Sequence, residues 1–215
     1  MKLRIFTVVS EPFSVNSYTV SLSGSQEALV IDPGFFTQTI FNYLEDNELV
    51  LSAILNTHGH MDHIAGNYEL KKYAPTAPII IGVKDALMLT DPQVNLSAQF
   101  GLPITSPAAD RTVADGDSFT AAGIPFEVIH IPGHSPGHVA YLFADQPSFL
   151  FGGDILFRGS IGRTDFPDGS YEDLIQGIQT RLLRLPKDTL VYPGHGPVTT
   201  IGHEILTNPF LGSSR

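Results

Sequence analysis

The amino-acid sequence predicts an α/β fold, an αββα sandwich in which two mixed sheets pack together and helices cover their outer faces. Two observations indicate this arrangement. Strand-like runs rich in β-branched and aromatic residues alternate with segments of helical periodicity towards both ends of the chain, whereas the middle holds successive strands separated by turns. The 215 residues contain no low-complexity linker or charge run, so we expect a single domain over residues 1–215.

The first half of the chain begins with strands predicted at residues 3–9, 18–22 and 28–31. The third strand ends in Asp32-Pro33-Gly34, a strong turn signal. A helix is predicted next from the spacing of Ile40, Tyr43, Leu44 and Leu49. An apolar strand at 51–56, a helix beginning at Asp62 or His63, and a short buried strand at 79–81 complete this half.

The second half is predicted to continue with two strand pairs, joined by Asp115-Gly116-Asp117 and by Ala122-Gly123-Ile124-Pro125. Strands at 139–143 and 148–151 follow. A helix at 171–184, a strand at 189–192 and a helix at 200–206 come last. In this order the loops that carry the most reactive side chains would gather at one sheet edge.

Composition limits the function. The chain is 42% hydrophobic, enough for a substantial core, and its lack of cysteine excludes disulfides and thiolate metal ligands. A net charge of −10 argues against nucleic acid, because duplex binding needs basic residues at the phosphates. The apolar run at 5–9 is too short for a signal peptide, and no stretch approaches the roughly 20 apolar residues of a transmembrane helix. We expect a cytoplasmic enzyme without a membrane partner, monomeric or a small homo-oligomer.

The most informative feature is the segment Thr57-His58-Gly59-His60-Met61-Asp62-His63, directly after the strand at 51–56. It places three imidazoles and one carboxylate within six consecutive positions. Imidazole nitrogen and carboxylate oxygen are ligands that borderline divalent metals prefer. Gly59 is small and Met61 is flexible, so the segment can turn its polar side chains inward. We interpret it as a metal-binding loop.

Further candidate ligands stand beside glycine at later strand ends: His134, Asp154 and His195. Each follows a β-branched or aromatic run and lies in a turn rich in glycine or proline, where a rigid sheet can hold a loop at its rim. We expect His138, on the following strand, to support a ligand by hydrogen bonding rather than to bind metal. Asp32 could brace the ligand loop, although a plain Asp-Pro-Gly turn explains it almost as well.

These residues, in this order, make the chain resemble the metallo-β-lactamase-fold hydrolases, and within them the short, single-domain bacterial form of glyoxalase II (hydroxyacylglutathione hydrolase). The resemblance covers nearly the whole chain, including Gly194-His195-Gly196-Pro197 and Asn208-Pro209-Phe210 near its end. It implies two divalent metal ions, with zinc favoured over iron or a zinc/iron pair. One ion would be bound by His58, His60 and His134, the other by Asp62, His63 and His195, and Asp154 would bridge them.

The resemblance also implies a reaction. A water shared by two metals becomes a hydroxide nucleophile near neutral pH, and a metal polarises the carbonyl under attack. The implied activity is hydrolysis of glutathione thioesters such as S-lactoylglutathione, with Asp62 and Asp154 as the carboxylates of the catalytic centre. The charge of two ions would also attract a small anionic substrate.

Substrate binding is less well defined by the motifs. Full-length glyoxalase II enzymes hold glutathione partly through a helical C-terminal domain, for which this chain ends too early. Within 157–166 we expect Arg163 to supply the positive charge, because its planar fork suits a carboxylate, with Arg158 as a second basic candidate. A structural salt bridge is the alternative role for Arg163.

Other functions compete with this interpretation. The run Gly162-Arg163-Thr164-Asp165-Phe166 also resembles the persulfide dioxygenases, which use one iron and oxygen. Other small thioesters or lactones are alternative substrates of a hydrolase. A non-catalytic metal-binding or RNA-processing role is disfavoured by the acidic charge balance.

Overall fold

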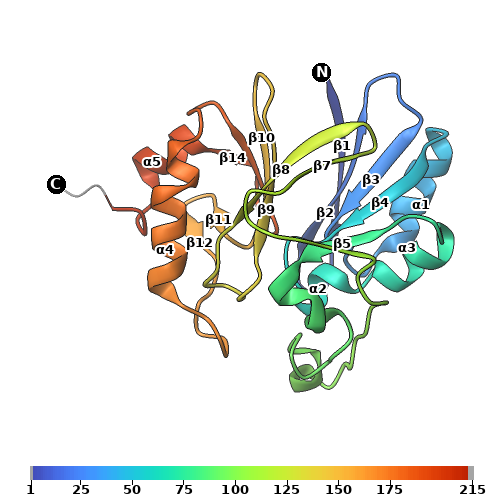
Figure 1. Cartoon of the computed structure of the whole chain (residues 1–215), viewed down its shortest axis with the longest axis horizontal. Coiled ribbons are helices and arrows are strands. Elements are labelled where there is room, and N and C mark those ends of the chain that lie inside the picture. The colour runs from blue at the N-terminus through green and yellow to red at the C-terminus, as the bar shows by residue number, and fades with distance from the viewer. Residues whose placement is uncertain (1, 213–215) are drawn as a thin grey trace.

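Figure 1 shows the computed structural model, in which residues 2–212 are described. Strand-forming segments of the first half build one six-stranded sheet in the order β1-β2-β3-β4-β5-β6. The first three strands are antiparallel, and β3, β4, β5 and β6 run parallel. The bounds are β1 (Leu3–Ser10), β2 (Val15–Leu22), β3 (Glu27–Ile31), β4 (Val50–Leu55), β5 (Ile79–Gly82) and β6 (Arg111–Val113).

The second six-stranded sheet has the order β14-β13-β10-β9-β8-β7. Only β10 and β13 are parallel within it, and the other neighbours are antiparallel. The bounds are β7 (Ser118–Ala121), β8 (Ile124–His130), β9 (Val139–Phe143), β10 (Phe149–Gly153), β13 (Leu190–Pro193) and β14 (Thr199–Thr200). A short hairpin of β11 (Leu156–Phe157) and β12 (Ser160–Ile161) follows β10.

Helices lie outside both sheets, as Figure 1 shows. On the first sheet these are α1 (Thr37–Asp46) and α3 (Asn67–Tyr73), and on the second α4 (Tyr171–Thr180) and α5 (Ile201–Thr207). The hydroxyls of Ser170 and Thr200 accept hydrogen bonds from backbone N–H groups in the first turns of α4 and α5, which explains where these two helices begin. No helix among residues 2–212 is long and apolar enough to cross a membrane.

Three apolar layers hold the sandwich together. The layer between the sheets contains large aromatic side chains, among them Tyr141, Phe126 and Phe151. A second layer, including Ile40 of α1, packs the first sheet against its helices, and a third, including Leu174 of α4, does so for the second sheet. Burial of these layers stabilises the arrangement. The predicted αββα sandwich is confirmed.

The predicted strand pair around Asp115-Gly116-Asp117 is wrong. β6 instead lies parallel to β5 in the first sheet, and β7 belongs to the second sheet, where it pairs with β8. The turn residues were correctly read as a turn, but the chain crosses there from one sheet to the other. Turn chemistry reports a local change of direction and does not specify which strands pair.

The helix predicted to begin at Asp62 or His63 is divided into α2 (Met61–Ile64) and α3. The break has a physical cause, because the backbone N–H of Gly66 donates to the carbonyl of Pro33 at 2.8 Å instead of continuing the helix. The helix predicted over 171–184 likewise ends at 180 and is followed by a 3-10 turn at Leu182–Arg184. Two further 3-10 turns, Val83–Leu89 and Ser97–Phe100, had no clear periodic signal.

The two sheets are joined at the edge where the candidate ligands lie. The side-chain amide of Asn16, on β2, donates to the carbonyls of Pro193 and Gly196 at 3.0 and 2.8 Å. The Tyr18 hydroxyl, on the same strand, donates to the Pro193 carbonyl at 2.6 Å. The loop that carries His195 is therefore fixed by a strand of the other sheet.

Candidate metal centre

The seven predicted ligands come together at one edge of the sandwich, in loops that follow β4, β8, β10 and β13. Side-chain donors of the predicted sets form two groups, and within each group the potential ligand atoms lie within 4.8 Å of one another. The first group is His58, His60 and His134, and the second is Asp62, His63 and His195. The structure thus brings together the members of each set that the resemblance implies, and their role as ligands stays a prediction.

The first group consists of three buried histidines whose nitrogens face a common point. The distance from His134 Nε2 to His60 Nδ1 is 2.9 Å, and that to His58 Nε2 is 3.2 Å. Three ring nitrogens this close cannot all be paired in hydrogen bonds with one another, because each neutral imidazole has one N–H donor and one lone-pair acceptor. Convergent lone pairs of this kind are suited to a cation.

Asp154 lies between the two groups. Its Oδ2 is 3.5 Å from His134 Nε2 in the first group and 3.5 Å from His195 Nε2 in the second. Its Oδ1 is 3.5 Å from His63 Nε2. Within the second group, Asp62 Oδ2 is 3.3 Å from His195 Nε2 and 3.7 Å from His63 Nε2. One carboxylate therefore reaches both groups.

Hydrogen bonds on the far side of the rings fix which nitrogen faces inward. His134 Nδ1 is 2.9 Å from the Arg163 carbonyl, and His195 Nδ1 is 3.2 Å from the Ser14 carbonyl. A carbonyl oxygen only accepts, so in both rings Nδ1 carries the proton and donates it. The Nε2 lone pair is then left for the centre, which is the arrangement that metal-binding histidines use.

Asp32 braces the ligand loop from the end of β3. Its carboxylate accepts hydrogen bonds from the Thr57 backbone N–H and the Thr57 hydroxyl, both at 2.7 Å. The same carboxylate lies 3.1 Å from His63 Nδ1, while His58 Nδ1 lies 3.1 Å from the Thr57 hydroxyl oxygen. One buried carboxylate thus orients one histidine of each group, directly or through Thr57.

His138 supports Asp154 through the backbone. Its Nε2 accepts a hydrogen bond from the Asp154 N–H at 2.9 Å, and its ring stacks on His58 at 4.6 Å. Gly153, immediately before Asp154, has a φ of 49° and no room for a Cβ beside Thr57. Glycine is required there both for the left-handed backbone and for the close approach.

The electrostatics of the two groups differ. Burial and repulsion between neighbouring histidines lower the pKa of His58 and of His60 well below the ordinary value. Burial also acts to lower the pKa of His63, but the surrounding carboxylates, above all Asp62 and Asp154, raise it to about 10. The first group is therefore neutral, whereas the second favours positive charge.

The donor set fits metal ions. Two buried atoms that face the centre, His63 Nε2 and Asp154 Oδ1, have no hydrogen-bond partner within residues 2–212. An unpartnered buried polar atom is destabilising unless something else binds it. Imidazole nitrogens with carboxylate oxygens are ligands that zinc and iron accept. Gly194 leaves the space open, since a Cβ there would overlap Asp154 and His63.

Asp85 is a buried carboxylate that the sequence did not single out. It accepts hydrogen bonds from the Gly59 N–H at 3.1 Å, the Ser135 hydroxyl at 2.6 Å and the Gly137 N–H at 2.6 Å. It therefore ties the loop of His58 and His60 to the loop of His134. Its neighbour Lys84 is exposed, and in the sequence the pair resembles an ordinary charged surface turn.

A cavity of about 360 Å³ opens over the centre, lined by candidate ligands from both groups and by several aromatic side chains. Arg163 is the only lysine or arginine that lines it within the described residues, and Arg158 is exposed and outside the lining. The Arg163 guanidinium already forms a two-point ion pair with Asp165, at 3.0 Å for each contact, and lies over the Phe166 ring. The structure thus shows the structural salt bridge of Arg163 and places this residue in the cavity lining, and its role as a substrate anchor stays a prediction.

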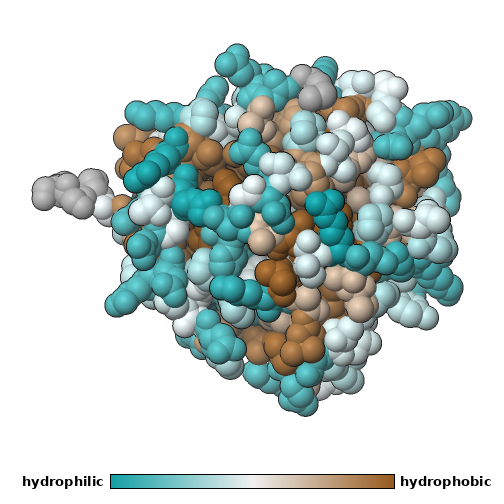
Figure 2. Space-filling model, viewed as in Figure 1, coloured by the Kyte–Doolittle hydropathy of each residue, from teal (hydrophilic) through white to brown (hydrophobic). Residues whose placement is uncertain are grey.

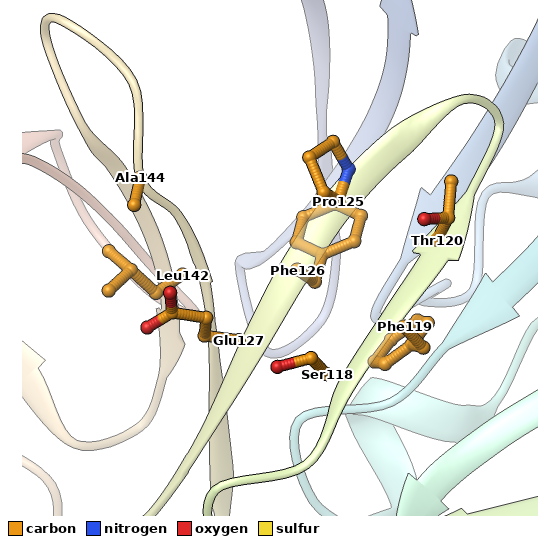
Figure 3. A pocket seen from close by; sticks show the side chains of 8 residues that line it. All are labelled: Ser118, Phe119, Thr120, Pro125, Phe126, Glu127, Leu142 and Ala144. Atoms are coloured by element: carbon orange, nitrogen blue, oxygen red, sulfur yellow. The ribbon is translucent and has the colours of Figure 1, made fainter.

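A second cavity, of about 320 Å³, lies across β7, β8 and β9 (Figure 3). Apart from Glu127, the single ionisable group among the described residues that line it, its side chains are apolar or hydroxyl-bearing. It contains none of the candidate ligands. The chemistry of the chain therefore belongs to the first cavity.

Comparison with known proteins agrees with this geometry. A family model described as the Metallo-beta-lactamase superfamily matches residues 10–195. Hydroxyacylglutathione hydrolase GloC of Haemophilus influenzae is 39% identical over 190 residues, which is 87% of this chain and 89% of that protein. The predicted resemblance to metallo-β-lactamase-fold proteins and to hydroxyacylglutathione hydrolases is confirmed.

Two solved structures are similar over nearly their whole length. BLEG-1 B3 metallo-beta-lactamase has a TM-score of 0.93 and 37% identity, with 98% of this chain and all of that chain covered (100%). TTHA1623, solved in a di-iron-bound form, has a TM-score of 0.83 and 38% identity, with 96% of this chain and 100% of that chain covered. At these identities the likeness extends beyond the fold to the sequence.

Proposed function

The chain belongs to the metallo-beta-lactamase superfamily, and from that premise we propose that it is a dinuclear metal-dependent hydrolase of glutathione thioesters such as S-lactoylglutathione. The observation that carries the proposal is the position of Asp154, whose two oxygens lie 3.5 Å from histidines of both groups. A carboxylate shared in this way is suited to a pair of ions. The hydroxyacylglutathione hydrolase relative supports the choice of thioester.

In this proposal the first ion would be held by His58, His60 and His134, and the second by Asp62, His63 and His195, with Asp154 binding both. The ions could be zinc, iron or one of each. When bound, a pair of ions lowers the pKa of water and polarises a carbonyl, so no serine or cysteine nucleophile is required.

The residues of the chain orient the centre. His134 and His195 each donate Nδ1–H to a backbone carbonyl and so present Nε2 inward. Asp32 fixes the ring of His63 and, through Thr57, that of His58. Rigid placement of this kind holds the reacting groups without reorganisation during the reaction. Asp62 and Asp154 are the proposed catalytic carboxylates because they face the centre.

In this proposal Arg163 binds a carboxylate of the substrate. It lines the cavity, and its guanidinium can exchange part of its pairing with Asp165 for a substrate carboxylate, because that ion pair is exposed to solvent. Arg158 is exposed and can contribute only from outside the cavity lining.

The single-iron alternative receives less support. A persulfide dioxygenase would need one ion, yet two of the three-residue groups that could hold an ion within residues 2–212 share no residue: His58, His60 and His134, and Asp62, His63 and His195. A second candidate reaction, hydrolysis of a β-lactam, is favoured by the similarity to BLEG-1 B3 metallo-beta-lactamase. This reaction would use the same centre, with the carbonyl of the β-lactam ring in place of the thioester carbonyl.

The test is a comparison of substrates with metal-loaded protein, run both under nitrogen and in air. We expect S-lactoylglutathione to release free thiol at a rate that does not depend on oxygen, and to be turned over more efficiently than a β-lactam such as nitrocefin. Oxygen uptake with glutathione persulfide and one iron per chain would instead identify a dioxygenase. Turnover of the β-lactam alone would transfer the proposal to the second candidate.

A further inference from the structure

One side of the cavity over the metal centre is apolar, although the centre itself is polar. Five lining residues form this surface, here called the apolar wall: Phe13, Leu96, Phe100, Phe157 and Phe166. They come from four separate segments of the chain. Figure 2 shows hydrophobic side chains gathered in the lower middle of this face, where the segment between β5 and β6 protrudes in Figure 1.

The wall borders the candidate ligands directly. The Phe166 ring centroid lies 4.9 Å from that of His60 and 5.5 Å from that of His134, and the Phe157 ring lies 6.2 Å from His195. Phe13 continues the surface outward through an edge contact with Phe100 at 5.7 Å. A molecule whose carbonyl lies at the centre would therefore place its adjoining atoms against apolar rings.

Leu96 has a strained backbone conformation. Its φ of 71° is in the left-handed region, which a branched, non-glycine residue rarely occupies. The buried side chain of Asn95 maintains it by donating to the carbonyls of Met88 and Ile104, both at 2.9 Å, and accepting from the Ser97 N–H at 3.0 Å. Strained residues persist where the surroundings over-determine them, and they cluster at ligand sites.

The same segment is tied to the ligand loop. The Asn95 carbonyl accepts a hydrogen bond from the Met61 N–H at 3.2 Å, immediately before Asp62. Leu96 is therefore placed relative to the metal centre by backbone contacts and is 8% exposed. Phe100, by contrast, is 57% exposed and leaves contact area for a ligand.

The charges of the cavity do not offset this apolar character. Its one arginine, Arg163, is already paired with Asp165, and the other charged residues of the lining are the candidate ligands Asp62 and Asp154. Within the described residues, little remains to bind the several charges of a glutathione arm. Apolar contact is the main interaction that the cavity offers beyond the centre.

We infer that the apolar wall selects thioesters that carry an apolar group next to the scissile bond, so that S-acyl chains longer and less polar than lactoyl are preferred. The inference rests on the proposed hydrolase function and narrows its substrate class. An aliphatic or aryl acyl group would contact Leu96 and the aromatic rings as it buries its surface. Each added methylene should then improve recognition by about two- to four-fold.

Binding is tested first, without turnover. Calorimetry on metal-loaded and metal-free protein with S-methyl-, S-butyl- and S-hexylglutathione, which are thioethers and cannot be hydrolysed, should show affinity rising by about two- to four-fold per methylene. Phe100→Ala, which removes the exposed ring of the wall, should lose most of this gain. Leu96→Gly removes the side chain and suits the left-handed backbone, so it should fold, and it should lose a smaller part of the gain because Leu96 exposes little area. Leu102→Ala, an exposed leucine outside the lining, should keep the wild-type gain.

Turnover is tested second, with S-acetyl-, S-lactoyl-, S-butanoyl- and S-hexanoylglutathione. We expect kcat/KM to rise along the apolar members and to flatten in Phe100→Ala. Hydrolysis of all four with no dependence on chain length, together with flat thioether binding, would overturn this inference and leave the proposed function standing. No hydrolysis of any member by metal-loaded protein would overturn the proposed function itself.

Discussion

The floor of the cavity and its apolar wall are built in opposite ways. The floor, meaning the seven candidate ligands, is polar and is held by side-chain hydrogen bonds from residues such as Asp32 and Asp85. The wall is apolar and consists of five side chains from scattered segments, one of them in a strained backbone. The floor fixes the positions of the donor atoms, whereas the wall supplies contact area.

This difference indicates that the two regions have different roles. Changes to the floor should affect metal content and the turnover of every substrate, because all reactions at the centre use the same donors. Changes to the wall should alter which substrate is preferred, because apolar contact is proportional to the area a given substrate buries. Substitutions at four positions, Asp154, Asp85, Asp32 and Arg163, test the first half of this statement and the boundary between the two regions.

The largest effect is expected for Asp154→Ala. Removing the carboxylate that reaches both groups should lower thioester turnover by roughly a thousand-fold or more, since bound ions contribute several kcal/mol to such reactions. Thiol release measured with lactoyl and hexanoyl substrates should fall equally. Asp188→Ala, an exposed carboxylate, is the matched control and should retain wild-type rates. A selective loss for one substrate would show that Asp154 acts in specificity.

Asp85→Ala should chiefly destabilise the fold. It leaves the Gly59 and Gly137 N–H groups and the Ser135 hydroxyl without their acceptor, and each unsatisfied buried donor costs about 1–3 kcal/mol. We expect a combined loss of at least about 3 kcal/mol in the free energy of unfolding, measured by chemical denaturation.

Asp85→Asn should lose less than the alanine variant. Burial raises the pKa of Asp85, so its ionised form lowers stability at pH values above the ordinary pKa of an aspartate. Asparagine removes that charge and retains one acceptor oxygen. Equal stability of the alanine variant and wild type would mean that the two ligand loops do not depend on this carboxylate.

Asp32→Asn should weaken metal binding by about ten- to a hundred-fold, the usual effect of removing a group that orients a ligand. Asparagine is chosen because Asp32 has a φ of 49°, a conformation it tolerates. Competition with a chelator measures the affinity, and circular dichroism checks that the variant folds. Unchanged affinity would show that the ring of His63 is oriented without this carboxylate.

The smallest effect is expected for Arg163→Ala, at the boundary between floor and wall. Its guanidinium is exposed and paired with Asp165, so KM for glutathione thioesters should rise by less than about ten-fold, with kcat and metal content nearly unchanged. Arg158→Ala should do less. Asp165→Ala frees the guanidinium and should lower KM. Equal effects of the two arginine variants would assign substrate binding elsewhere.

The floor could be predicted from the sequence because histidine and aspartate are concentrated in one short segment. Three histidines and one aspartate within six positions have no common structural explanation, and Asp154 follows a β-forming run that ends in glycines. Sheet strands were found for a related reason, since runs such as Ile79–Gly82 are buried and rich in isoleucine. Local pattern and proposed function coincide at the ligand positions.

The wall and the braces could not be predicted in the same way. Leu96 lies in a segment without periodicity, and its left-handed backbone depends on the distant carbonyls that Asn95 contacts. Asp85 bonds to residues 26, 50 and 52 positions away along the chain. Such contacts exist only once the two sheets are assembled, so no local pattern marks them.

Metal content is the most direct test of the central claim, that one carboxylate joins two ion-binding groups. Purified protein is loaded with zinc or iron, passed over a desalting column and measured by elemental analysis. We predict two ions per wild-type chain and weakened binding of both in Asp154→Ala, because a shared ligand supports both sites. Saturation of wild type at one ion, or two tightly held ions in Asp154→Ala, would contradict the dinuclear centre.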